Sequence, residues 1–252
     1  MTGDRVVTIE RAPLARRILR ASLRLVRPII AFNYVAGAPT RLAAGVPDDA
    51  SHGLIEGPRP LHLLVVGGLS GSSVGVRSFE LGVAHQFAKS LARSTGRGVE
   101  WESVATDRPR LAATAASIRS LEGLGSFDFI VLSPGTTDVL SFASLRLWRQ
   151  EIERLLVFLA EKTSPRALIV VTRIPDVSNY VQVGPMLGEI LSDDSRRFSA
   201  AAADACARTP KTEFVELPLV EKSDFLSGAF SYTALYRRWG VFLASVATVH
   251  LG

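Results

Sequence analysis

A turn rich in glycine and serine, residues 67–75, holds the groups of this sequence best suited to binding an anion or attacking an acyl group. It follows the apolar run 61–66 and contains Gly67, Gly68 and Ser70. Backbone N–H groups in such a turn can bind a carboxylate or an acyl carbonyl oxygen, and a serine hydroxyl is a nucleophile once a base takes its proton. The turn lacks the Lys-Ser/Thr ending of a phosphate loop and the GxGxxG spacing of a dinucleotide site. A tight turn that only serves the fold is the competing interpretation.

A second polar turn, residues 134–138, follows another apolar run and carries Gly135, Thr137 and Asp138. The Thr137 hydroxyl could donate a hydrogen bond to a ligand, and the Asp138 carboxylate could take a proton from Ser70. Asp138 could equally cap the turn that follows its strand. The predicted binding residues are therefore Gly67, Gly68, Ser70, Gly135, Thr137 and Asp138, with Ser70 as the candidate nucleophile.

Histidine is the usual base for a serine nucleophile, and none of the four histidines falls beside these turns. His52, His62, His85 and His250 are spread over a linker, a strand start, a helix and the chain end. We expect His62 and His85 to be structural or exposed, which leaves Asp138 or Asp224 as alternative bases. No cofactor and no metal site are expected.

Cys206 is the single cysteine, so the chain has neither an internal disulfide nor a cysteine-based zinc site. It falls in an alanine-rich segment with helical character, where a small buried side chain is expected rather than a reactive thiol.

Strands and helices alternate along most of the chain. Apolar runs predict strands at 61–66, 99–105, 127–133, 167–172 and 212–217, and helical periodicity predicts helices at 79–94, 110–121, 144–162, 194–208 and 234–249. This order predicts a three-layer α/β/α domain of the flavodoxin-like type with a five-stranded parallel sheet. Ligands of such sheets bind where the strands end, which is where both polar turns fall.

The first 60 residues differ from the rest. The formal net charge is +5 and the isoelectric point near 9.8, but the arginines concentrate in the first 41 residues. Residues 12–32 predict a basic amphipathic helix, so we divide the chain into an arm (1–36), a linker (37–60) and a domain (61–252). Such an arm fits an anionic membrane surface, or a helix docked on the domain, and no nucleic-acid partner is expected. The apolar stretch 28–38 is too short to cross a membrane, and cytoplasmic or peripheral membrane localisation is favoured over export.

Five segments resemble motifs of the SGNH (GDSL-type) hydrolases, especially actinobacterial members. LHLLVVGGLSGSSVGV (61–76) resembles LRLLVLGDSxAAGVGV without a gap, and VEWESVA (99–105) stands where the second motif begins. FIVLSPGTTDVL (129–140) resembles VVVLxGxNDVL, and RLWRQEIERLL (146–156) resembles RRWRRDLRALL. SGAFSYTALYRRW (227–239) is similar to DGFHPSPAGYRLW with one residue deleted. The resemblance covers nearly the whole chain and implies the SGNH-hydrolase fold.

The resemblance also implies that the catalytic positions have been replaced. Carried over position by position, they are Gly68 for the aspartate before the nucleophile, Leu69 for the serine, Arg108 for the second-motif glycine, Thr137 for the oxyanion asparagine, Gly228 for the late aspartate and Ser231 for the histidine. Leucine cannot form an acyl-enzyme, and no imidazole stands at the base position. The sequence therefore predicts a pseudo-hydrolase that acts as a ligand-binding or interaction module.

Two alternatives stay open. One is a divergent esterase or acyltransferase that uses Ser70 on acyl esters, lipids or acylated sugars. The other is an accessory subunit of a related active protein. The expected partners are accordingly an acyl or sugar-ester ligand or another protein.

Overall fold

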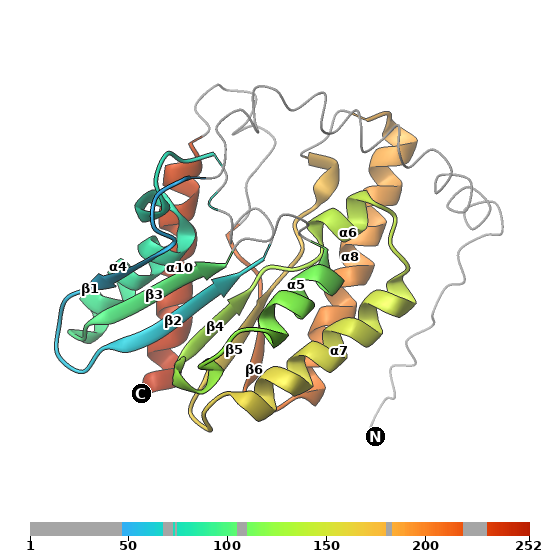
Figure 1. Cartoon of the computed structure of the whole chain (residues 1–252). Coiled ribbons are helices and arrows are strands. Elements are labelled where there is room, and N and C mark those ends of the chain that lie inside the picture. Colours follow the sequence, from blue (N-terminus) through green and yellow to red (C-terminus); the bar gives the residue numbers. More distant parts are fainter. Residues whose placement is uncertain (1–46, 68–72, 74, 105–109, 180–182, 219–230) are drawn as a thin grey trace, which may run out of the picture.

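The protein folds as a six-stranded sheet between two layers of helices (Figure 1). The computed structural model describes residues 47–67, 73, 75–104, 110–179, 183–218 and 231–252. The strand order is β1-β3-β2-β4-β5-β6; the last five strands in sequence are parallel and β1 is antiparallel to β3. The α/β/α architecture expected from the sequence is confirmed, with six strands instead of five.

The strands are β1 (His52–Ile55), β2 (Leu61–Val66), β3 (Val99–Val104), β4 (Phe129–Leu132), β5 (Leu168–Thr172) and β6 (Thr212–Val215). The α-helices of the described residues are α4 (Val83–Thr95), α5 (Leu111–Arg119), α6 (Thr136–Leu140), α7 (Leu145–Lys162), α8 (Pro185–Arg208) and α10 (Tyr232–Leu251). Three short 3-10 helices accompany them, η1 (Phe79–Leu81), η2 (Leu124–Ser126) and η3 (Val177–Asn179).

Three parts of this arrangement differ from the sequence prediction. Strand β1 lies inside segment 37–60, which was predicted to be a linker; its four residues pair with β3, and Gly53 lies against the indole of Trp101. The predicted turn 134–138 is the start of helix α6. Helix α8 begins at Pro185, nine residues before the predicted start, because proline is well tolerated in the first turn of a helix.

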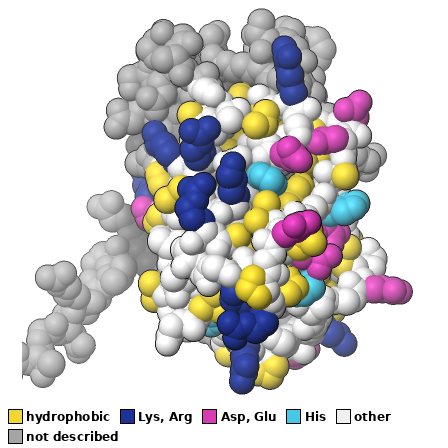
Figure 2. Space-filling model, turned by 90° about the vertical axis from the view of Figure 1, so that its left-hand side faces the viewer, with side chains coloured by type: hydrophobic (Ala, Val, Ile, Leu, Met, Phe, Trp, Pro, Cys, Tyr) yellow, Lys and Arg dark blue, Asp and Glu magenta, His cyan; other side chains and the backbone are white. Residues whose placement is uncertain are grey.

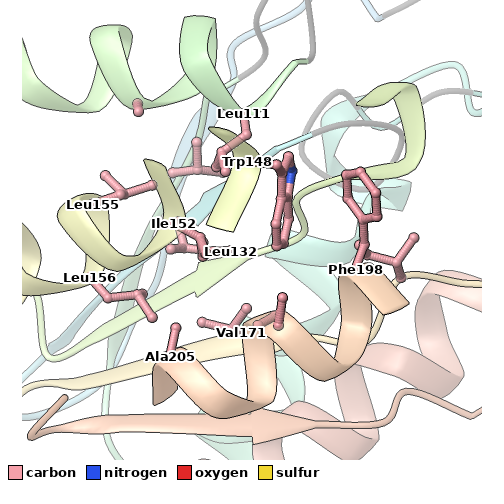
Figure 3. Close-up of a cluster of buried hydrophobic side chains, with 14 of the residues drawn as sticks. Leu111, Leu132, Trp148, Ile152, Leu155, Leu156, Val171, Phe198 and Ala205 are labelled. Carbon is pink, nitrogen blue, oxygen red and sulfur yellow. The ribbon is translucent and has the colours of Figure 1, made fainter. Parts of the chain in front are cut away.

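One face of the sheet is covered by α5, α7 and α8, whose apolar side chains meet those of β2, β4 and β5 (Figure 3). Trp148 of α7 and Phe198 of α8 lie with their ring centroids 5.0 Å apart in this core. Cys206 is buried here as expected, and burial raises the pKa of its thiol to about 11.

The other face is covered by α4 and α10, which pack directly on each other. Gly240 makes this close approach possible, because a Cβ atom at this position would lie 2.5 Å from the backbone carbon of Gln86. Further along, the hydroxyls of Ser94 and Thr248 are 3.1 Å apart. The two helices therefore run side by side in the same direction. Trp101 and Trp239 pack in this second core, whereas Trp148 packs in the first.

The predicted arm, 1–36, lies outside the described residues, as does the linker up to residue 46. Within the part of the chain that the structure describes, no helix combines the length and hydrophobicity required to span a bilayer.

Candidate functional site

The carboxyl ends of β2, β4 and β5 meet at one edge of the sheet, next to the first polar turn. Gly67 follows β2 with a φ of 123°, and a Cβ atom there would lie 2.7 Å from the carbonyl oxygen of Ser133. The backbone N–H of Ser133 donates to the carbonyl of Val66 at 3.0 Å. Both the positive φ and the close approach require glycine, so the first turn starts against the end of β4.

Two hydroxyl groups at this edge were not predicted. Thr172, the last residue of β5, donates from Oγ1 to Oγ of Ser133 at 3.1 Å. Ser133 is partly exposed, whereas Thr172 is buried. The sequence did contain a signal for both residues, because each one ends an apolar run that predicts a strand. The carboxyl ends of neighbouring parallel strands lie at one edge of the sheet, where ligands bind.

The second polar turn lies at the same edge and begins helix α6. Gly135 has a φ of 98°, and a Cβ atom there would lie 2.3 Å from Cδ1 of Ile174. Thr137 is partly exposed, and its hydroxyl forms no hydrogen bond with the residues described here. That hydroxyl is therefore free to donate to a ligand, with a shorter reach than an asparagine amide.

Asp138 is buried, and its carboxylate caps another helix instead of its own turn. Its Oδ2 accepts a hydrogen bond from the backbone N–H of Leu111, the first residue of α5, at 2.9 Å. Burial raises the pKa of Asp138, against smaller opposing effects of the Leu111 N–H and the Arg110 charge. The indole N–H of Trp148 lies near this carboxyl group but not in hydrogen-bond geometry. Asp138 thus ties the first residue of α5 to helix α6.

The four histidines of the chain all lie in the described part, on four different elements, β1, β2, α4 and α10. His62 pairs through Nδ1 with Glu100 at 3.0 Å, at the amino ends of β2 and β3. His250 lies 3.0 Å from the carbonyl of Arg166, before the start of β5. His52 is exposed on the outermost strand, β1.

His85, in α4, contacts Trp101 edge-on with ring centroids 5.6 Å apart. Burial lowers the pKa of His85, so it is a packed neutral imidazole at neutral pH.

Ser231, which the sequence resemblance aligns with the histidine of the SGNH hydrolases, is the N-cap of α10. Its hydroxyl accepts a hydrogen bond from the backbone N–H of Ala234 at 3.3 Å. A hydroxyl has no basic form near neutral pH, and this one is already engaged by the helix.

Ser73, in the first turn, is fully buried with a φ of 49°, and its Oγ has no hydrogen-bond partner. A non-glycine residue with positive φ is strained. Strain and an unsatisfied hydroxyl thus occur together at Ser73.

The remaining predicted positions, Gly68, Leu69, Ser70, Arg108 and Gly228, lie outside the described residues, as does Asp224. Of the predicted binding residues, Gly67 and Gly135 both lie at the carboxyl edge, next to the ends of β2 and β4, and Thr137 and Asp138 follow in α6. Among the described residues no group of histidine, cysteine and carboxylate side chains is arranged to hold a metal ion.

The sequence matches no protein-family model and no curated protein. Solved structures with a similar fold include LAE5, an α/β hydrolase enzyme from the metagenome of Lake Arreo, with a TM-score of 0.53, 10% identity and coverage of 78% of this chain and 98% of that one. TesA is similar at a TM-score of 0.51 and 19% identity, over 74% of this chain and 97% of that one. A putative GDSL-like lipase from Bacteroides ovatus ATCC 8483 is similar at a TM-score of 0.52 and 12% identity, over 78% of this chain and 55% of that one. The chain therefore has an SGNH hydrolase-like fold, the fold of a lipase and esterase class.

Proposed function

We propose that this protein is a non-catalytic member of the SGNH fold class that binds a ligand or a partner at the carboxyl edge of its sheet. The observation that carries the proposal is the role of Ser231. The residue at the position of the family's general base is a serine whose hydroxyl caps α10, and the chain's four histidines have other places in the fold. Without a base, a serine hydroxyl stays protonated and attacks esters poorly.

Asp138 is poorly suited to replace a histidine base. Its carboxylate is buried and accepts the Leu111 N–H, so it is engaged in holding α5. Removing a proton from a serine requires a base within hydrogen-bond reach of that serine and free to accept. The joint replacement of base and nucleophile, Ser231 and Leu69, supports loss of hydrolysis rather than a slower enzyme.

The carboxyl edge keeps groups that could bind an acyl or sugar-ester ligand. The free hydroxyl of Thr137 and the partly exposed hydroxyl of Ser133 come from neighbouring parts of one edge. Neutral hydroxyl donors suit a carbonyl or a sugar hydroxyl better than a phosphate, which would require cations. We further propose that the basic segment 12–32 holds the protein at an anionic membrane surface.

Fluorophosphonate labelling and a series of p-nitrophenyl esters test the proposal. We expect no covalent adduct and no hydrolysis above that of the heat-unfolded protein. Labelling that is present in the native protein and absent in Ser70→Ala would overturn the proposal and establish the alternative, a divergent esterase. Ser72→Ala is the matched control, because it removes a hydroxyl from the same turn without touching Ser70.

The membrane arm is tested separately by flotation with vesicles of phosphatidylcholine and phosphatidylglycerol. We expect that replacing Arg16, Arg20, Arg24 and Arg27 by serine weakens flotation of the full chain. Equal flotation of the two proteins would refute a membrane role of the arm and leave the catalytic question untouched.

A further inference from the structure

The two helical layers of the domain differ in charge. Helices α4 and α10 contain four basic residues and no acidic residue: Lys89, Arg93, Arg237 and Arg238. On the other side of the sheet, α5, α7 and α8 together contain seven acidic and eight basic residues. The net positive charge of the helices is therefore larger in the layer of α4 and α10, +4 against +1.

Three of the four basic residues of this layer form no ion pair with a described carboxylate. Lys89, Arg93 and Arg237 are exposed and take part in no ion pair of the described residues. In the other layer five arginines are paired, Arg119 and Arg154 with Glu151, Arg196 with Asp193, Arg197 with Asp194 and Arg208 with Glu153, whereas Arg146, Arg149 and Lys162 of α7 take part in no ion pair of the described residues. The α7 cations share their helix with three glutamates, whereas α4 and α10 contain no carboxylate. Exposed cations that form no ion pair contribute a positive potential at the surface.

Aliphatic side chains are exposed on the same layer. Val241 is 56% exposed and Val249 82% exposed, both on the outward side of α10. Because α4 and α10 run side by side, these valines and the three unpaired cations form one surface, the α4/α10 basic face (Lys89, Arg93, Arg237, Val241, Val249). Figure 2 views the molecule from this side: a group of dark blue side chains lies at the upper left, others lie at the top right and at the bottom, and magenta ones lie at the centre and right.

We propose that the α4/α10 basic face binds an anionic lipid surface. Cations close to such a surface are attracted by its negative potential, and exposed aliphatic side chains between them can enter the headgroup region. A single-stranded nucleic-acid partner is disfavoured, because sites that bind single strands combine cations with exposed aromatic rings, and the exposed large hydrophobic side chains of the described residues are aliphatic. This surface belongs to the folded domain and is distinct from both the basic arm and the carboxyl edge.

The proposal is tested with the full chain, so that the arm is present in every sample. Partitioning onto phosphatidylcholine vesicles with and without phosphatidylglycerol is measured for wild type, for the variant K89S/R93S/R237S and for the control R146S/R149S/K162S. The control removes two arginines and one lysine from α7, all exposed and in no ion pair of the described residues. Circular dichroism and urea midpoints check that both variants are folded.

We expect the α4/α10 variant to partition onto anionic vesicles about a hundredfold more weakly than wild type, since three surface cations are lost. The control keeps wild-type partitioning, and higher salt weakens binding of the wild type. A second pair of variants tests the aliphatic side chains. We expect V241S/V249S to bind anionic vesicles more weakly than wild type, and the control L147S/V157S, on α7, to bind them as wild type does.

Three results would overturn the proposal. The first is no difference between wild type and the α4/α10 variant, and the second is an equal loss in variant and control. The third is binding of the wild type to an oligonucleotide or to an acidic protein but not to anionic vesicles. None of these outcomes bears on ester hydrolysis.

Discussion

The carboxylate of Asp138 accepts the backbone N–H of Leu111 at 2.9 Å, which joins α6 to the first residue of α5 across 27 positions of sequence. Leu111 directly follows Arg110, where the loop of the second SGNH-like motif ends. One buried side chain of α6 therefore holds the first residue of α5. The sequence resemblance aligns Asp138 with the aspartate of the family's motif, and this contact gives the residue a structural role.

The first prediction concerns the charge of Asp138. Because its folded-state pKa is raised by burial, protonation favours the folded state, and this contribution is lost as pH rises from its ordinary value of 3.8 through the folded-state pKa. Asp138→Asn keeps an oxygen for Leu111 and removes the buried charge. We expect its free energy of unfolding in urea to exceed that of wild type at neutral pH, with the difference shrinking as the pH falls.

Asp138→Ala is the matched control for this experiment. It leaves the buried Leu111 N–H without an acceptor, which costs about 1–3 kcal/mol. If Asp138→Asn were as unstable as Asp138→Ala at neutral pH, the ionised carboxylate itself would be required.

The second prediction concerns Ser231. Replacing this N-cap by alanine removes the acceptor for the Ala234 N–H and lowers the free energy of unfolding by about 1 kcal/mol. Ser231→Asp keeps the cap and should be as stable as wild type. Thermal or urea unfolding measures both, and a neutral Ser231→Ala would argue against the capping role.

The third prediction concerns Ser73. Glycine adopts a positive φ without strain and carries no unsatisfied hydroxyl, so Ser73→Gly should stabilise the fold by about 1 kcal/mol. Ser73→Ala removes only the hydroxyl and keeps the strained φ, and its gain should be smaller. Equal or lower stability of Ser73→Gly in urea would show that packing of the buried Ser73 side chain outweighs its strain and its unsatisfied hydroxyl.

The fourth prediction concerns Cys206. Burial raises its thiol pKa to about 11, so the thiolate that reacts with alkylating agents is scarce at neutral pH. Iodoacetamide should leave the folded protein unlabelled and label it fully in urea. Rapid labelling of the native protein would contradict the burial of the Cys206 thiol.

The sequence by itself determined the α/β/α class, because fully apolar runs such as 129–132 fit only strands buried on both faces of a sheet. It also located the polar turns at strand ends, since residue order places turn glycines directly after those runs. It missed β1, a four-residue edge strand whose stability comes from pairing with β3 and from the contact of Gly53 with Trp101. A strand this short has too few residues for a periodic signal.

Tertiary structure alone decided the partners of the site residues. The sequence shows that residues 231 and 138 are polar. Their roles follow from the hydrogen bonds that they accept, Ser231 from the backbone N–H of Ala234 and Asp138 from that of Leu111. The Ser133 and Thr172 hydroxyls, 39 residues apart, meet because neighbouring parallel strands end together. The charge difference between the two helical layers likewise appears only when α4 and α10 pack side by side, because net charge counts residues without their positions in space.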